Sequence, residues 1–152
     1  PYRFFSACLR TSVMLANARR AVRDAGLDKR IMLAPADAAL FDPQQVFGRG
    51  SFDRVFMSYT LSMIPPWREA LARGCDVLSP DGELFVADFG DQAHLPKAFR
   101  AMLYRWLAAF SVTPRLDLEE ELGRQAEARG RVSKFERPYR GYAFLGHIGP
   151  GV

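Results

Sequence analysis

Apolar residues recur every three or four positions in several stretches, a spacing that places them on one face of a helix. The first predicted helix follows a cap at Thr11 or Ser12 and ends at Gly26, the usual C-terminal position for glycine. A second continues from Pro66, because a proline suits the first helical turn, where its missing N–H is not needed. The apolar faces of these two helices consist of Met14, Ala18, Val22 and Ala25, and of Trp67, Ala70, Leu71 and Gly74.

Two more helices are predicted in the second half of the chain. One spans residues 95–110. The other starts at Asp117, where Glu120 completes a capping box, and ends near Gly130. The apolar face of the helix over residues 95–110 consists of Phe99, Met102, Leu103, Trp106 and Phe110.

Short apolar runs between the helices predict strands. They lie at residues 2–7, 31–33, 54–58 and 83–88, with two closing strands at residues 132–137 and 142–146, joined around Gly141. A turn at residues 79–82 precedes the clearest strand, with Pro80 fixing φ and Gly82 adopting a positive φ. Strands that alternate with helices predict parallel crossovers, whereas the two closing strands are too close for a crossover and must pair antiparallel. The pattern therefore predicts an α/β fold in a single domain over residues 1–152.

Composition and charge bear on the cellular location and the partners of this domain. The chain has 152 residues and a net charge of +4, carried mainly by arginine. That charge fits attraction to phosphate or anionic lipid, and it equally fits arginine used as a general solvated cation. Cys8 and Cys75 lie too far apart in sequence for a metal knuckle or a disulfide framework. With no signal-peptide pattern and no long apolar run, we expect a cytoplasmic location.

Three segments together carry a resemblance to a known family. Residues 14–20, MLANARR, resemble the start of the helix after the second strand of class I S-adenosylmethionine (SAM) methyltransferases. Residues 52–67 are similar to that family's fourth strand and the loop beyond it. Residues 78–90 match its turn and fifth strand, with Asp81 in place of a glycine. The resemblance implies a Rossmann-like methyltransferase sandwich, a mostly parallel sheet that ends in a C-terminal antiparallel hairpin, with SAM as cofactor.

A narrower resemblance concerns the acceptor. Residues 58–67 and 86–91 are similar to bacterial methyltransferases of lipid head groups, in particular the betaine-lipid diacylglycerylhomoserine N-methyltransferases. The resemblance implies methyl transfer to a small amine or a lipid head-group amine. The alternative is a non-catalytic, methyltransferase-like remnant that binds a partner, such as a second copy, or a membrane surface. No catalytic residue is predicted, because methyl transfer depends mainly on positioning.

The family's glycine-rich loop and first strand would precede Pro1, so the resemblance implies an N-terminally incomplete domain. The acidic residue that accepts the ribose hydroxyls is also missing, since Cys8 or Leu9 stands at its position. Residues 146–151, GHIGPG, are glycine-rich but follow the last strand with no helix after them, so we do not expect them to replace the loop.

The remaining family positions give the candidate site. Asp37 and Ala38 match the pair near the adenine amino group, although Asp37 equally fits a solvated turn. Ser58 and Tyr59 end a strand at the edge where such sheets bind ligands, and are expected to flank the cofactor, with Tyr59 also on the substrate side. A half-buried aromatic with a solvated hydroxyl is the alternative for Tyr59.

Asp88 ends the next strand, where it either faces the substrate or caps the following segment. His94, in the loop beyond it, is more typical of a surface residue than of a base.

Two features bear on partners. The apolar face of the helix over residues 95–110 is compatible with a position at a membrane interface. Packing of this face on the sheet is the favoured alternative. The basic C-terminal third fits anionic lipid at the inner face of a membrane, and it lacks the interleaved aromatic residues typical of single-stranded nucleic-acid binding.

Overall fold

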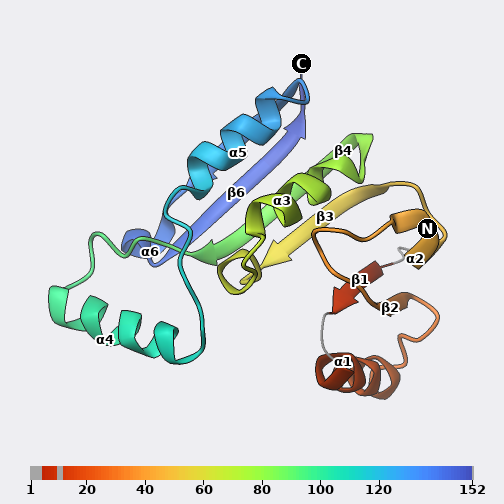
Figure 1. Ribbon diagram of the computed structural model, residues 1–152, viewed down its shortest axis with the longest axis horizontal. Coiled ribbons are helices and arrows are strands. Elements are labelled where there is room, and N and C mark those ends of the chain that lie inside the picture. The colour runs from red at the N-terminus through yellow and green to blue at the C-terminus, as the bar shows by residue number, and fades with distance from the viewer. Residues whose placement is uncertain (1–4, 10–11, 152) are drawn as a thin grey trace. The chain divides into compact units, whose positions relative to one another are not determined.

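The computed structural model describes residues 5–9 and 12–151. The chain divides into two compact units, Pro1–Ser51 and Phe52–Val152, and each is described by itself (Figure 1). The α/β class and the antiparallel C-terminal pair are confirmed, but the described strands form two sheets, one in each unit. The single domain over residues 1–152 stays a prediction.

Unit 1 contains one parallel strand pair. Strand β1 (Phe5–Leu9) pairs with β2 (Ile31–Pro35), and α1 (Ser12–Asp24) forms the crossover between them. Gly26, with φ 65°, ends the helical segment as predicted. Leu15 is the buried residue of α1, and Ala18 and Val22 are half-buried, whereas Met14 and Ala25 are exposed. The middle of the predicted apolar face is therefore confirmed, and Leu15 replaces Met14 at its start. Thr11 and the side chain of Cys8 lie outside the described part of the chain.

A short helix, α2 (Pro43–Phe47), was not predicted. Asp42 caps it by accepting hydrogen bonds from the backbone N–H groups of Gln44 at 2.8 Å and Gln45 at 3.2 Å. Pro43 occupies the first turn, and Gly48 ends the helix with φ 66°. These are ordinary helix signals, so the sequence does encode α2, although its five residues are too few for an apolar period to be visible.

The sheet of unit 2 has the strand order β3-β4-β6-β5. Strand β3 (Phe52–Ser58) runs parallel to β4 (Leu78–Phe89), while β6 (Ala143–Pro150) runs antiparallel to both β4 and β5 (Arg131–Glu136). Residues 143–150 form a strand, so the glycines of the GHIGPG segment lie in or beside β6 rather than in a loop before a helix. Between β5 and β6 lies the four-residue helix α6 (Pro138–Gly141).

Helices α3 (Trp67–Asp76) and α5 (Leu118–Glu127) lie along one face of this sheet (Figure 1). That face carries Leu84 and its cross-strand partner Ile148, both without exposed surface. Gly146 allows the close approach of α5, because a Cβ there would collide with the Leu122 side chain. Burial raises the pKa of Cys75, on α3, to about 11, so this thiol stays protonated and structural at neutral pH.

Two local predictions were wrong. Residues 79–82 form no separate turn but an irregular bulge within β4, where Phe52 pairs with Leu78 and Arg54 already pairs with Glu83. Gly82 does not have a positive φ; glycine is needed there because a Cβ would lie 2.8 Å from the carbonyl oxygen of Phe52.

The capping box at Asp117 is also absent. The Asp117 side chain makes no capping hydrogen bond and instead accepts one from Arg68 of α3. The carboxylate thus connects two helices instead of ending one.

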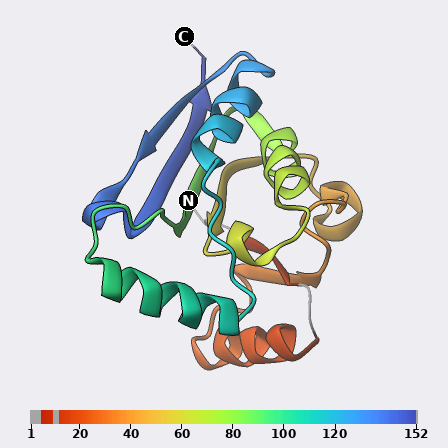
Figure 2. The same ribbon diagram turned by 60° about the vertical axis from the view of Figure 1, so that its left-hand side comes forward.

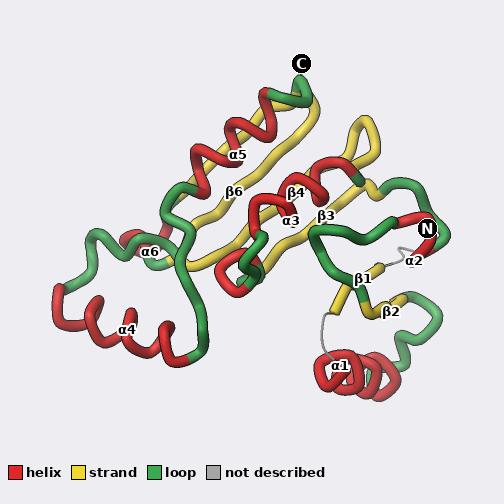
Figure 3. The backbone as a smooth tube through the Cα atoms, in the orientation of Figure 1, coloured by secondary structure: helices red, strands yellow, loops and turns green. Residues whose placement is uncertain are grey.

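Helix α4 (Lys97–Ala109) departs most from expectation. It is linked to the rest of unit 2 by loops at both ends, and in two views it lies away from α3 and α5 (Figures 2 and 3). Only Leu103 and Leu107 of the helix are buried. The packed face that we expected is therefore wrong for most of its members, because Phe99, Met102, Trp106 and Phe110 are exposed.

We expect Gly90→Ala to lower the free energy of unfolding by about 3 kcal/mol, because no side chain fits beside this backbone. The N–H of Gly90 donates to the carbonyl oxygen of Tyr142 at 2.9 Å, and an added Cβ would collide with the carbonyl oxygen of Gly141. Gly123→Ala is the matched control, since a Cβ there meets nothing within 4 Å and alanine favours the helix by about 1 kcal/mol. Urea unfolding measures both, and equal stability of the two variants contradicts this packing.

Candidate functional site

The carboxyl ends of β3 and β4 meet at one edge of the sheet, because the two strands are parallel. Ser58 is the last residue of β3, and it pairs with Ala87 of β4. The N–H of Tyr59 donates to the carbonyl oxygen of Ala87 at 2.7 Å, which extends the pairing one residue past the strand. The structure therefore brings Ser58, Tyr59 and Asp88 together at one edge, as the sequence predicts.

Tyr59 is the exposed aromatic group of this edge. Its ring centroid lies 4.8 Å from that of Phe89, and its backbone has φ 49°, in the left-handed region that non-glycine residues rarely adopt. Ser58 is also exposed, and its carbonyl oxygen accepts a hydrogen bond from the Thr60 hydroxyl at 2.9 Å. The two residues are accessible to a ligand, which is what the predicted cofactor contacts require.

Asp88 has no exposed surface. One carboxylate oxygen, Oδ2, accepts a hydrogen bond from the N–H of Ser62 at 3.0 Å, and Oδ1 accepts one from the N–H of Phe89 at 2.8 Å. Ser62 lies in the 3-10 helix η1 (Leu61–Met63), so Asp88 ties the loop after β3 to the end of β4. Of the two roles left open by the sequence, the backbone contact is observed, and substrate contact by Asp88 stays a prediction.

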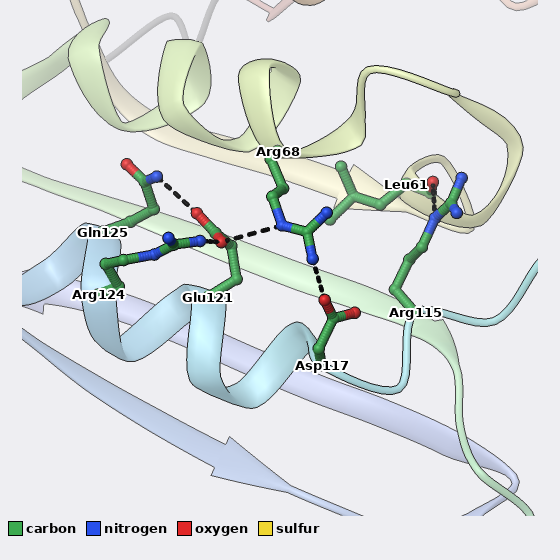
Figure 4. A network of polar contacts seen from close by, with 7 residues as sticks. All are labelled: Leu61, Arg68, Arg115, Asp117, Glu121, Arg124 and Gln125. Carbon is green, nitrogen blue, oxygen red and sulfur yellow. Dashed lines mark hydrogen bonds and ion pairs between the residues drawn. The ribbon is translucent and has the colours of Figure 1, made fainter.

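Arg115 holds the same loop from the other side. Its Nε donates to the carbonyl oxygen of Leu61 at 3.0 Å (Figure 4). A terminal nitrogen of the same side chain donates to the carbonyl oxygen of Ile64 at 2.9 Å. Burial lowers the pKa of Arg115, and the neighbouring carboxylates of Asp88 and Asp117 partly offset this effect. Sequence reasoning assigned no role to Arg115, because contacts with distant carbonyl groups leave no local pattern.

A second polar cluster ties α3 to α5. The buried carboxylate of Glu121 accepts hydrogen bonds from Arg124 and Gln125 (Figure 4). It also forms an ion pair with Arg68, which forms another with Asp117. Both oxygens of Glu121 are therefore engaged, so the cluster is structural. It fixes the helix that follows Arg115 and thereby supports the loop-holding contacts above.

Three buried polar atoms at this edge have no hydrogen-bond partner among the described residues. They are the hydroxyl of Ser62 and both amide atoms of Gln92. Gln92 follows β4, has φ 55°, and donates its own N–H to the carbonyl oxygen of Gly141 at 2.7 Å. Since buried polar groups normally find partners, these atoms point to a partner that the described residues do not supply. Sequence reasoning missed both residues, because a polar residue in a loop ordinarily indicates solvent.

Asp37 and Ala38 belong to unit 1, in the turn after β2, and both are half-buried. Asp37 Oδ1 accepts a hydrogen bond from the N–H of Ala39 at 2.9 Å, and its carbonyl oxygen accepts from Leu40 and Phe41. The turn is thus ordered by Asp37, while its Oδ2 accepts no hydrogen bond from the described residues and fits an acceptor for an exocyclic amine.

His94 is exposed in the loop before α4. Within residues 12–151, no group of His, Cys, Asp or Glu is arranged to hold a metal ion. Nor does any described helix have the length and apolar character needed to cross a bilayer.

Parallel strand pairs with helical crossovers, closed by an antiparallel pair, define the Rossmann-like fold class. Solved structures agree. The YcgJ protein from Bacillus subtilis is 12% identical, with a TM-score of 0.70 over 99% of this chain and 83% of its own. The O-methyltransferase NcsB1 from neocarzinostatin biosynthesis, solved with SAM and a naphthoic acid, is 16% identical, with a TM-score of 0.62 over 95% of this chain and 41% of its own.

The [4+2]-cyclase SpnF is similar too, at 16% identity and a TM-score of 0.65 over 99% of this chain and 67% of its own. At such identities the likeness concerns the fold alone. No curated relative matches the sequence.

The methyltransferase domain family matches residues 7–86, which is more than half of the chain, and the chain therefore belongs to that family. Its class is that of the SAM-dependent methyltransferases, with SAM as cofactor. The chain spans less than half the length of NcsB1.

The described residues fit this cofactor in part. In unit 1, Oδ2 of Asp37 is open to the predicted adenine contact, and in unit 2, Ser58 and Tyr59 are exposed at the strand edge; each cofactor contact stays a prediction. However, none of the described strand-to-helix connections is a glycine-rich turn of the kind that lets a backbone approach the amino-acid end of SAM.

We expect Asp88→Asn to lower the free energy of unfolding by about 3 kcal/mol, since a carboxamide has one oxygen for two buried N–H donors. The exposed Asp81→Asn is the control, with an expected change within about 0.5 kcal/mol. Chemical unfolding followed through the buried Trp67 measures both. If the two variants are equally stable, Asp88 does not hold the loop.

Proposed function

We propose that the carboxyl edge of β3 and β4 takes part in transfer of a methyl group from SAM to a small amine or a lipid head-group amine. The observation that carries the proposal is the ordered loop after β3, held by Asp88 and Arg115. It presents the Tyr59 ring beside Phe89. Because methyl transfer relies on alignment of nucleophile and methyl group, a rigid edge is the main contribution that the protein can make.

The orphaned polar atoms support an acceptor with hydrogen-bonding groups. The Ser62 hydroxyl and the Gln92 amide are buried and without partners among the described residues. A polar head group would supply partners to groups that are otherwise costly to bury. The sequence similarity of residues 58–67 and 86–91 to betaine-lipid N-methyltransferases favours an amine attached to lipid.

A second candidate function is a methyltransferase-like module without catalysis. One observation favours it: no glycine-rich turn follows a described strand. This candidate predicts no SAM binding and a stable dimer whose population rises with concentration.

Calorimetry with SAM and S-adenosylhomocysteine separates the two candidates. For the enzyme we expect binding, and Asp37→Asn weakens it about tenfold because the hydrogen bond to a charged acceptor is lost. Asp28→Asn, an exposed residue of the same unit, is the control and keeps the wild-type affinity.

If neither SAM nor S-adenosylhomocysteine gives a heat of binding with the wild-type chain, methyl transfer by these residues alone is excluded. That result favours the non-catalytic module. Where SAM binds, transfer of its labelled methyl group to ethanolamine, homoserine or their lipids identifies the acceptor class. Equal affinity of both Asp variants would show that Asp37 does not contact the adenine.

A further inference from the structure

Helix α4 exposes an apolar stripe that the fold does not use. Met102, Trp106 and Phe110 are 60%, 54% and 59% exposed, and Phe99 is 43% exposed. Helical periodicity places these four side chains on one face, and the Trp106 and Phe110 ring centroids lie 4.9 Å apart. Only one margin of the stripe, Leu103 and Leu107, is buried. The apolar surface is therefore wider than the part that holds the helix in place.

The charges around this stripe have a single sign. Lys97, Arg100 and Arg105 lie on α4, and the sequence has no acidic residue between Asp91 and Asp117. By the same periodicity, Arg100 and Arg105 lie on opposite flanks of the stripe, whereas Lys97, in the first turn, lies on the other side of the helix. Aromatic residues on one face with cations beside them are typical of helices that lie in the interface of an anionic membrane.

Helix α4 is also connected to the candidate site. Leu103, Leu107 and Val112 form a buried cluster against which Phe89 packs. The same Phe89 ring contacts Tyr59 at the carboxyl edge. The Tyr104 hydroxyl donates to the carbonyl oxygen of Asp91 at 3.5 Å, just beyond β4. A surface bound by α4 would thus lie next to the segment that ends β4.

We propose that α4 docks the protein onto an anionic lipid surface, with Met102, Trp106 and Phe110 in the interface and the flanking cations on lipid head groups. Complementary charge favours this occupant, because every charged residue of α4 is a cation. The proposal goes beyond the proposed methyl transfer and does not depend on which acceptor is used.

Cosedimentation and fluorescence test the docking directly. The chain is mixed with vesicles of phosphatidylcholine alone and of equimolar phosphatidylcholine and phosphatidylglycerol. We expect binding to the anionic vesicles only, weakened by high salt. Fluorescence should shift to the blue on binding, and Trp106 is the source, because the other tryptophan, Trp67, is only 4% exposed.

Two pairs of variants locate the contact. Trp106→Ser is expected to remove both the shift and most of the binding, whereas Tyr139→Ser, an exposed aromatic elsewhere, keeps them. Reversing Lys97, Arg100 and Arg105 to Glu should weaken binding about a hundredfold. Reversing Arg19, Arg20 and Arg23 of α1 gives the same net charge, and a much smaller loss is expected.

Each other outcome overturns the proposal. Equal losses in the two triple variants would mean that binding is a general effect of charge. Absence of vesicle binding would exclude docking outright, and a dimer that is lost in Trp106→Ser, seen by light scattering, would then assign the stripe to a second copy of the chain. Circular dichroism confirms that each variant is folded.

Discussion

The hydrogen bonds of the Asp88 carboxylate determine the order of the candidate site. A buried carboxylate is costly unless its oxygens accept hydrogen bonds. Both oxygens of Asp88 do so, one from the N–H of Ser62 in the loop after β3 and one from the N–H of the next residue, Phe89. The bond to Ser62 fixes the loop after β3 against the end of β4. Arg115 then binds two carbonyl oxygens of the same loop, and the Arg68–Glu121 cluster holds the helix beyond Arg115 in place. Removal of the carboxylate therefore affects more than a local contact.

This arrangement fits a family of group-transfer enzymes whose chemistry needs no catalytic triad. Positioning is what methyl transfer requires, and in the proposed function the carboxyl edge supplies it through backbone contacts rather than through reactive side chains. Tyr59 and Ser58 remain exposed on the ordered loop, while the unpartnered atoms of Ser62 and Gln92 lie behind it. Phe89 contacts both Tyr59 at the carboxyl edge and the buried residues of α4. This one aromatic ring therefore connects the helix to the candidate site.

Apolar periodicity predicted the alternating strands and helices and the closing antiparallel pair, because those features depend on local pattern and connection length. It also placed Ser58, Tyr59 and Asp88 at one edge. The pattern gave wrong predictions where contacts between distant elements determine the structure. The stripe on α4 has the period of a packed face, yet the sheet offers it no partner, and Asp117 fits a capping box but pairs with Arg68 on another helix. Burial of Ser62 and Gln92 is likewise a property of the assembled unit, which no local pattern encodes.

Native-state hydrogen exchange of the Ser62 amide tests the central claim most directly, because this N–H donates to Asp88. If the carboxylate fixes the loop, the Ser62 amide exchanges only when unit 2 unfolds as a whole, as slowly as the Val86 amide in the middle of β4. The amide of Thr113, which donates to the Ser62 carbonyl oxygen, should follow the same rate. Exchange of Ser62 at the rate of an exposed loop amide such as that of Leu116, whose N–H donates to none of the described residues, would contradict the account.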